Sequence, residues 1–273
     1  MLKKKQGTGC YLVSIFKILG VDLMNERDLY GVDELSKDRL FFGVDSNVRA
    51  NNTLQNNLTQ FEWVKRNKSH PNFWFRNING KNSLTIEEID FIRMCGTKIG
   101  AVCRDDGPKE KIIQGDIFVS GLLNTINKLR IPQGSAIFIA FDDDDIVSTE
   151  YMYGYAQKLL SSGFVPGFKA NTDAHYPFDK EFSRGIKYEN NVFKKCLVWA
   201  TTPVIDEYDG ITTTHLIHPE NWLPFAPSGI TRNDIDVWQY GRKCHPINDN
   251  FDEETFFNVN LTNNFDLVNK YLF

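Results

Sequence analysis

An apolar segment that runs into four consecutive carboxylates is the part of this chain with the clearest chemical potential. Residues 136–141 are apolar and are followed by Asp142, Asp143, Asp144 and Asp145. A buried strand alternates its side chains between two faces, so Asp142 and Asp144 would project together at its C-terminal end. Crowded acids beside a core strand are costly unless they lie at an open mouth. Such mouths, at the C-terminal ends of strands, are where α/β enzymes place their catalytic groups.

Other predicted strands also end in residues that could reach this mouth. In residues 40–46, alternation puts Asp45 on one face with Phe41 and Gly43, opposite the bulkier apolar face of Leu40, Phe42 and Val44. In residues 72–78, Arg76 shares a face with Trp74, and in residues 236–240 the two aromatic residues share a face. If these faces are interior, the mouth holds Asp45, Arg76, Asp142, Asp144, Trp238 and Tyr240.

The predicted set of residues suits the cleavage of an acetal. Two carboxylates that flank a bond, one of them made a proton donor by its neighbours, can hydrolyse a glycosidic linkage. Arg76 would hold one carboxylate ionised, and aromatic rings would stack on sugar faces. Two other interpretations of the acid run are open. Asp143 to Asp145 would cap a helix that begins near Ser148 or Thr149, or the acids would bind calcium or magnesium.

Other catalytic and metal-binding patterns are weak. No GxSxG motif occurs, and His215 and His218 lack a third ligand, so we predict no metal site. Cys10 follows a glycine near a helical segment, but a catalytic thiol needs a histidine partner and the nearest, His70, is far along the chain. The five cysteines include no CxxC pair, which argues against a disulfide framework. No cofactor is predicted.

The overall composition excludes several classes of partner. The chain has 273 residues, of which 41% are hydrophobic and 24% charged, with a net charge of −4. The absence of a basic stripe disfavours a nucleic-acid partner. No apolar run approaches the roughly 20 residues of a membrane helix, so no membrane partner is expected. The first residues make a poor secretory signal, so either the protein is not exported by that route or this is a piece of a longer chain. Localisation and oligomeric state stay open.

Alternating strand and helix patterns predict the architecture. The expected strands are 40–46, 72–78, 98–103, 136–141, 164–169, 196–200, a weak 215–218, and 236–240. The expected helices are 53–66, 85–94, 112–129, 149–160 and 266–272, with long loops over 171–195 and 201–235. This pattern predicts an α/β, (β/α)8 TIM-like barrel over residues 39–273, irregular in its second half, with a short N-terminal helical appendage over residues 1–38. A doubly wound open sheet would need a glycine-rich phosphate turn after its first strand, which the chain lacks.

The order of several motifs resembles a known family. These motifs are Phe42-Gly43-Val44-Asp45-Ser46, Phe75-Arg76, Leu84-Thr85-x-x-Glu88, Ile131-Pro132-x-Gly134, the strand that ends in the acid run, Trp199-Ala200 and Trp238-Gln239-Tyr240. Over roughly residues 39–262 the chain resembles the glycoside-hydrolase-like domain family of unknown function that is related to the family 25 lysozymes. The resemblance implies a TIM-like barrel and a role in the cleavage or recognition of bacterial cell-wall glycan.

The resemblance also implies roles for individual residues. Asp45 matches the acid that ends the first strand, and Asp142 and Asp144 match the acid pair of the fourth strand, where the lysozymes have Asp and Glu. Asn258 lies where a further acid is expected, and an amide cannot act as a base. The residues implied in substrate binding are Arg76, Trp199, Trp238, Gln239, Tyr240 and Asn258.

Two functional hypotheses follow. The first is a glycosidase that acts on peptidoglycan-type polysaccharide of β-1,4-linked amino sugars, with Asp142 or Asp144 as general acid and the other, or Asp45, as base or stabiliser. The second is a catalytically inactive glycan-binding module on the same barrel, motivated by Asn258 and by the short side chain of Asp144. A metal-assisted hydrolase that uses the acid run is a third possibility. The sequence favours an enzyme without deciding the matter.

Overall fold

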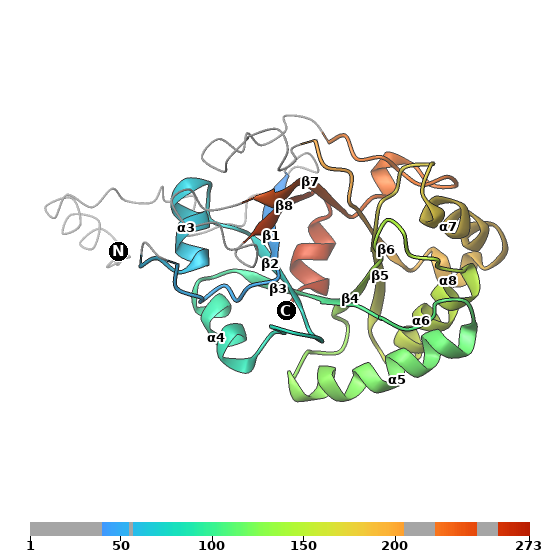
Figure 1. Ribbon diagram of the computed structural model, residues 1–273, viewed down its shortest axis with the longest axis horizontal. Helices are drawn as coiled ribbons and strands as arrows, with labels where there is room; N and C mark the ends of the chain where they lie inside the picture. The colour runs from blue at the N-terminus through green and yellow to red at the C-terminus, as the bar shows by residue number, and fades with distance from the viewer. Residues whose placement is uncertain (1–39, 55–56, 205–221, 245–255) are drawn as a thin grey trace, which may run out of the picture. The chain divides into compact units, whose positions relative to one another are not determined.

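Eight strands close into a barrel in chain order, from β1 to β8 (Figure 1). The structure, a computed structural model, describes residues 40–54, 57–204, 222–244 and 256–273. The predicted α/β TIM-like fold is confirmed. The appendage predicted over residues 1–38, the weak strand at 215–218, Cys10 and both His215 and His218 lie outside the described residues.

Between residues 72 and 170 the bounds of the elements follow the predicted ones closely, whereas the helix predicted over residues 53–66 spans only Gln60–Asn67. The strands are β1 (Phe41–Ser46), β2 (Phe73–Asn77), β3 (Lys98–Cys103), β4 (Ala136–Ala140), β5 (Val165–Ala170), β6 (Leu197–Ala200), β7 (Val237–Cys244) and β8 (Phe257–Thr262). The helices are α3 (Gln60–Asn67), α4 (Ile86–Met94), α5 (Ile112–Lys128), α6 (Thr149–Ser161), α7 (Pro177–Tyr188) and α8 (Asn190–Phe193), with a 3-10 turn η3 (Arg232–Asp234) and a π-helical turn η4 (Leu267–Tyr271).

Strand β8 was not predicted, and it changes how the barrel closes. Strands β1 to β7 pair in parallel, whereas β8 is antiparallel to both of its neighbours, β7 and β1. Its sequence, Phe-Asn-Val-Asn-Leu-Thr, has the period-2 alternation of a strand. Because β8 runs the opposite way, its first residues lie at the rim where the parallel strands end.

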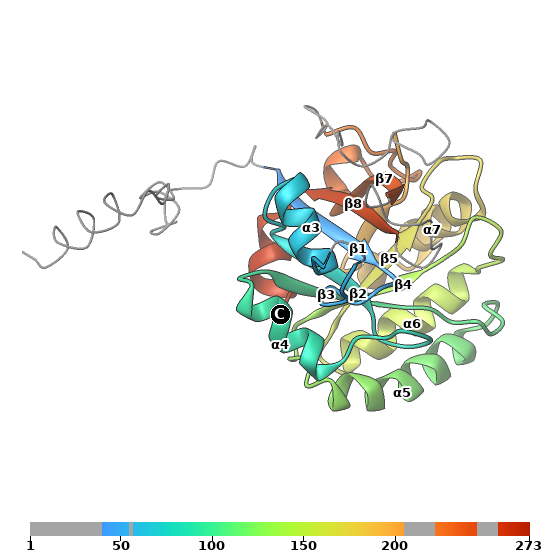
Figure 2. The ribbon, with the colours of Figure 1, turned by 60° about the vertical axis from the view of Figure 1, so that its left-hand side comes forward.

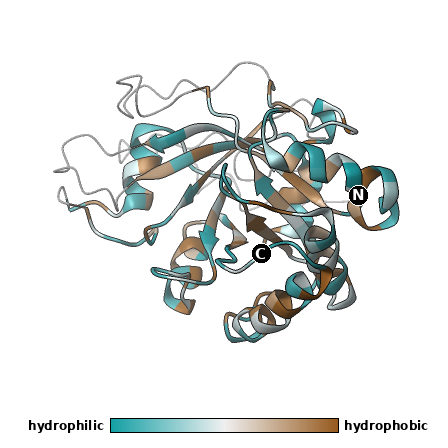
Figure 3. Ribbon diagram, turned by 45° about the vertical axis from the view of Figure 1, so that its right-hand side comes forward, coloured by the Kyte–Doolittle hydropathy of each residue, from teal (hydrophilic) through white to brown (hydrophobic). Residues whose placement is uncertain are grey.

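Helices α3 to α8 lie around the outside of the barrel and carry alternating hydrophobic and hydrophilic residues (Figures 2 and 3). Local capping explains where they begin: the side chains of Thr85 and Ser148 accept bonds from the backbone N–H groups of Glu88 and Tyr151. Helix α7 lies in a segment predicted to be a loop. Over the described ranges, no helix has the length and apolar character that crossing a bilayer requires.

Aromatic rings fill the barrel interior, and glycines on neighbouring strands make room for them. The rings of Phe75 and Trp199 have centroids 4.4 Å apart. A Cβ atom on Gly100 would lie 2.0 Å from the Phe75 ring, and one on Gly167 would lie 2.4 Å from the Phe138 ring. These positions therefore require glycine for close approach rather than for backbone conformation.

The C-terminal turn η4 covers one end of this interior. Leu267, Val268 and Leu272 belong to the same hydrophobic cluster as the residues at the beginnings of the strands. The backbones of Phe273 and Ile99 exchange two hydrogen bonds, of 2.9 and 3.1 Å, which hold the last residues against β3. The cavity described below lies at the opposite rim.

Candidate functional site

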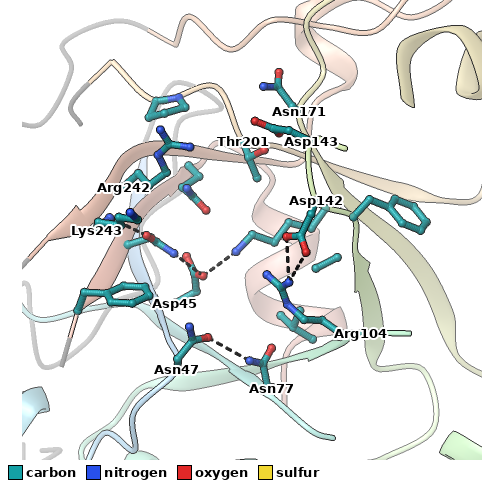
Figure 4. A pocket seen from close by; sticks show the side chains of 18 of the residues that line it. Asp45, Asn47, Asn77, Arg104, Asp142, Asp143, Asn171, Thr201, Arg242 and Lys243 are labelled. Atoms are coloured by element: carbon teal, nitrogen blue, oxygen red, sulfur yellow. Dashed lines mark hydrogen bonds and ion pairs between the residues drawn. The ribbon is translucent and has the colours of Figure 1, made fainter. Parts of the chain in front are cut away.

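A cavity of about 500 Å³ opens where the parallel strands end (Figure 4). Its lining is mostly polar or charged, and every strand of the barrel contributes to it directly or through the segment beside it. The lining residues are Asp45, Asn47, Asn77, Val102, Arg104, Ala140, Phe141, Asp142, Asp143, Lys169, Asn171, Tyr176, Thr201, Pro203, Gln239, Arg242, Lys243, Phe256 and Asn258. The predicted location of the site, at the C-terminal rim of the parallel strands, agrees with this cavity.

Asp45 lies at the centre of a hydrogen-bond network built by β8. Asp45 is the cross-strand partner of Asn258, whose side-chain amide donates to Asp45 Oδ2 over 3.0 Å. The amide of Asn260, one strand repeat further along, donates to Asp45 Oδ1 over 2.8 Å. The Lys169 amine completes the set, with Nζ 2.6 Å from Oδ2. Antiparallel β8 thus brings both amides to the end of β1.

Lys169 projects inward from β5 and is held on two sides. Its Nζ lies 4.0 Å from the centre of the Trp199 ring, and the side chains of Lys169 and Asp45 are 13% and 12% exposed. Burial lowers the pKa of the Lys169 amine, although Asp45 opposes that effect. Trp199 itself donates from Nε1 to Asn260 Oδ1 over 3.0 Å. The predicted sugar-binding residue Trp199 therefore lies beneath the cavity and is fully buried.

Asp142 lines the cavity, as predicted, but as one half of an ion pair. Its two carboxylate oxygens accept from Nη1 of Arg104 over 2.9 and 2.7 Å. Both side chains are about half exposed. The next residue, Asp143, also lines the cavity and makes no hydrogen bond or ion pair with any residue that the structure describes.

The prediction that Asp144 shares the cavity with Asp142 is wrong. Strand β4 ends at Ala140, and the acids that follow form a turn in which the backbone N–H of Asp145 donates to the carbonyl of Asp142 over 3.1 Å. The Asp145 side chain accepts from the Asp142 backbone and pairs with Lys109 over 2.8 Å. Asp144 is exposed at the tip, outside the cavity lining. Strand alternation fails here because the strand has already ended. Ser148, rather than the acids, caps α6.

Arg76, Trp238 and Tyr240 also differ from their predicted positions, because β2 and β7 present the opposite faces to the interior. Arg76 points outward, where its Nε lies 2.7 Å from Glu88 Oε1 on α4 and both side chains are fully buried. Its other nitrogens donate to the carbonyls of Ser46 and Asn82. The Trp238 ring packs outside the barrel and donates to the carbonyl of Thr202 over 3.0 Å.

The inward face of β7 brings Gln239 into the cavity, and β8 brings Asn258 there, as predicted for both residues. Gln239 is 4% exposed, and its Oε1 has no hydrogen-bond partner among the described residues. Tyr240 is fully buried beside Trp238, with ring centroids 6.1 Å apart. The aromatic rings that line the cavity are therefore other ones, namely Phe141, Tyr176 and Phe256.

Four basic residues of the cavity were missed at the sequence level. Lys169 and Arg104 come at or just after the ends of predicted strands, so the alternation that selected Asp45 would have found them. Arg242 and Lys243 are consecutive and both line the cavity. Simple alternation would have separated them, and irregular pairing of β7 with β8 brings them together.

The part of the chain that the structure describes contains no clear set of metal ligands. No group of three or more His, Cys, Asp or Glu side chains is arranged there to hold an ion. In the acid run, Asp142 and Asp145 already pair with Arg104 and Lys109.

Comparisons with known proteins agree on the fold. No family model and no curated protein matches the sequence. An uncharacterized B. stearothermophilus protein aligns with 22% identity and a TM-score of 0.69, over 85% of this chain and 100% of that one. The Clostridium perfringens spore cortex lytic enzyme SleM aligns with 11% identity and a TM-score of 0.51, over 86% of this chain and 70% of that one. A family GH25 lysozyme from Aspergillus fumigatus aligns with 11% identity and a TM-score of 0.48, over 83% and 95%. The resemblance to glycoside-hydrolase-like barrels that the sequence predicts is confirmed at the level of the fold.

Proposed function

We propose that this protein binds a cell-wall-type polysaccharide in the cavity at the mouth of its barrel and holds it without cleaving it. The supporting observation is the state of the two cavity carboxylates that were expected to catalyse hydrolysis. Asp45 already accepts from Lys169, Asn258 and Asn260, and Asp142 accepts twice from Arg104. A general acid must present a proton to the leaving oxygen, whereas the oxygens of these two carboxylates accept hydrogen bonds from cations and amides.

The cavity suits a saccharide in size and in lining. Its volume, about 500 Å³, falls within the range of roughly 300–1,000 Å³ that is usual for ligand sites. The amides of Asn47, Asn77 and Asn171 offer donors and acceptors for hydroxyl groups, while Tyr176 and Phe256 offer ring faces. The choice of a cell-wall glycan rests on the family resemblance and on the fold shared with a spore cortex lytic enzyme.

Hydrolysis is the second candidate, and Asp143 is the observation that favours it. Asp143 lines the cavity, and its carboxylate is engaged by no other described residue. It is therefore the cavity carboxylate best placed to carry a proton to a glycosidic oxygen. Asp142, on the same wall, would then stabilise positive charge on the sugar ring.

One incubation separates the two candidates. The full chain is mixed with insoluble peptidoglycan, the pellet is assayed for bound protein, and the supernatant is analysed for released fragments by chromatography. We expect the protein in the pellet and no fragments in the supernatant. Fragments would instead make hydrolysis the function, and Asp143→Asn would then reduce their release at least about a hundredfold. Asp144→Asn removes the same charge outside the cavity and is the matched control. The absence of both binding and fragments would reject both candidates.

A further inference from the structure

The wall of the cavity formed by β7 combines an irregular backbone with two adjacent cations. The pairing of β7 with β8 shifts register between Gln239 and Gly241 and again between Gly241 and Cys244. Within this irregular stretch, both Arg242 and Lys243 reach the cavity lining. Bulges that re-aim side chains are concentrated at barrel rims and beside binding sites.

Lys243 is held in a backbone conformation that favours glycine and is unusual for lysine. Its φ is 51°, in the left-handed region, which costs on the order of 1–3 kcal/mol for a residue with a side chain. The backbone N–H of Lys243 donates to Asn258 Oδ1 over 2.9 Å, and the same Asn258 side chain donates to Asp45. The strained position is thus tied to the central network of the site rather than to a surface turn.

Gln239 adds a third polar group to this wall. It lines the cavity, it is 4% exposed, and its buried Oε1 has no hydrogen-bond partner among the described residues. A buried acceptor without a donor costs free energy, on the order of 1–3 kcal/mol. A ligand that brings an N–H or O–H group to this position would remove that cost.

Charge is distributed unevenly around the cavity, because Arg242 and Lys243 both line the wall formed by β7. Figure 4 shows Arg242 and Lys243 on one side of the cavity and Asp142 and Asp143 on the other, with Asp45 between them. A ligand with an anionic group would therefore be oriented with that group toward β7.

We infer that Gln239, Arg242 and Lys243 form a subsite for a carboxylate carried by the glycan. Arg242 and Lys243 bind the carboxylate, and Gln239 accepts from a neighbouring hydroxyl or amide N–H group. This inference rests on the proposed function and adds that acidic glycans are preferred over neutral ones. The carboxylate belongs either to the sugar or to a peptide attached to it.

Calorimetric titration with matched probes tests the subsite. The probes are the disaccharide of N-acetylglucosamine and N-acetylmuramic acid, the same disaccharide with its carboxyl group reduced to an alcohol, and the disaccharide with a peptide on that carboxyl group. We expect the acid to bind at least about tenfold tighter than the alcohol, the scale of one charge-assisted hydrogen bond. Arg242→Gln and Lys243→Gln should each remove about that tenfold for the acid and weaken binding of the alcohol much less.

The remaining outcomes are equally informative. Lys270→Gln removes one charge outside the cavity and should change neither affinity. Tight binding of the peptide-bearing probe, weakened by Arg242→Gln, assigns the carboxylate to the peptide. Equal affinity of the unmodified protein for acid and alcohol, with no tighter binding of the peptide-bearing probe, would reject the subsite while leaving the proposed function intact. If neither disaccharide binds, the proposed function fails and the subsite with it.

Discussion

Asp45 and Asp142 line the same cavity, but their ion pairs differ in burial. The side chains of Asp45 and Lys169 are 12% and 13% exposed, whereas those of Asp142 and Arg104 are 57% and 49% exposed. Water screens the outer pair and weakens its contribution to stability. The inner pair lies where Coulomb attraction is stronger and where an unmatched charge is costly. Asp45 therefore organises the floor of the site, and Asp142 remains accessible at its edge.

A double-mutant cycle measures the inner pair. We expect Asp45→Asn and Lys169→Met each to lower the free energy of unfolding in urea, because each variant leaves the partner's charge buried and unmatched. In the double variant both charges are absent, so the coupling energy between the two substitutions should be about 2 kcal/mol. The exposed pair of Asp266 and Lys270 is the matched control, and its coupling should not exceed about 0.5 kcal/mol. Equal coupling in the two cycles would contradict the structural role given to Asp45.

At the scale of elements, the sequence predicted strands well and their inward faces less well. In β1 the polar strand end made the inward face clear, and Asp45 is where alternation placed it. Asp142 also lines the cavity, although it lies two residues beyond the end of β4. In β2 both faces carry large aromatic residues, so alternation left two equivalent choices. In β7 the two aromatic residues share one face, and that face was wrongly assigned to the interior. The interior takes Phe75 rather than Trp74, and Gln239 rather than Trp238.

Helix α7 shows that some missed elements had readable signals. Its segment was taken for a loop because polar residues surround it. Yet Pro177 is at its first turn, and Phe178 and Phe182 are spaced by four residues and both buried. By contrast, no hydrophobic periodicity in the sequence predicts the register shifts that bring Arg242 and Lys243 together.

The pair of Arg76 and Glu88 joins β2 to α4, and its loss should unfold that junction. Glu88 Oε1 accepts from Arg76 and also from the backbone of Ala50, over 2.8 Å. We expect Arg76→Met to lower the free energy of unfolding by about 3–5 kcal/mol, because it leaves Glu88 as an uncompensated buried charge.

Urea unfolding checks this prediction, and two further variants sharpen it. Adding Glu88→Met to Arg76→Met should recover part of the loss, since the stranded charge is then gone. Arg184→Met breaks an exposed pair with Glu150 and should cost at most about 1 kcal/mol. If Arg76→Met kept full stability but lost glycan binding, the conclusion that Arg76 lies outside the binding site would be wrong.

At the scale of the whole molecule, repeated strand–helix units made the barrel predictable. The way in which the barrel closes could not be predicted from them. The seven parallel strands follow from units that each bury their own hydrophobic surface. The last strand has no such unit. It is defined by its two neighbours, since β8 pairs with β1 more than 200 residues earlier in the chain. Its asparagines also complete the network around Asp45, so the step that closes the barrel also completes the site.

The closed end of the barrel contains a group that should make the stability of the whole protein depend on pH. The Asp236 carboxylate accepts from the backbone N–H of Val198 on β6 over 2.7 Å and from the Asn264 amide, beyond β8, over 2.6 Å. These bonds favour the charged form, but burial outweighs them and raises the pKa of Asp236 to about 7, with Asp234 adding to the effect. The folded protein therefore holds a proton that the unfolded chain, with an ordinary value near 4, releases.

The sign of the pH dependence follows from that difference in bound protons. Between about pH 4 and pH 7 the folded state binds more protons than the unfolded state, so the free energy of unfolding should fall as the pH rises, by at most about 1.4 kcal/mol per pH unit. Urea unfolding of the unmodified protein and of Asp236→Asn across this window isolates the contribution, because the amide does not titrate. As the pH rises, the free energy of unfolding of the unmodified protein should fall relative to that of Asp236→Asn. Asp116→Asn, at an exposed carboxylate, should show no such trend. A difference that stayed constant, or moved the other way, would mean that the two hydrogen bonds outweigh burial and that Asp236 is charged throughout. A permanently charged carboxylate would then join β6 to the segment that follows β8.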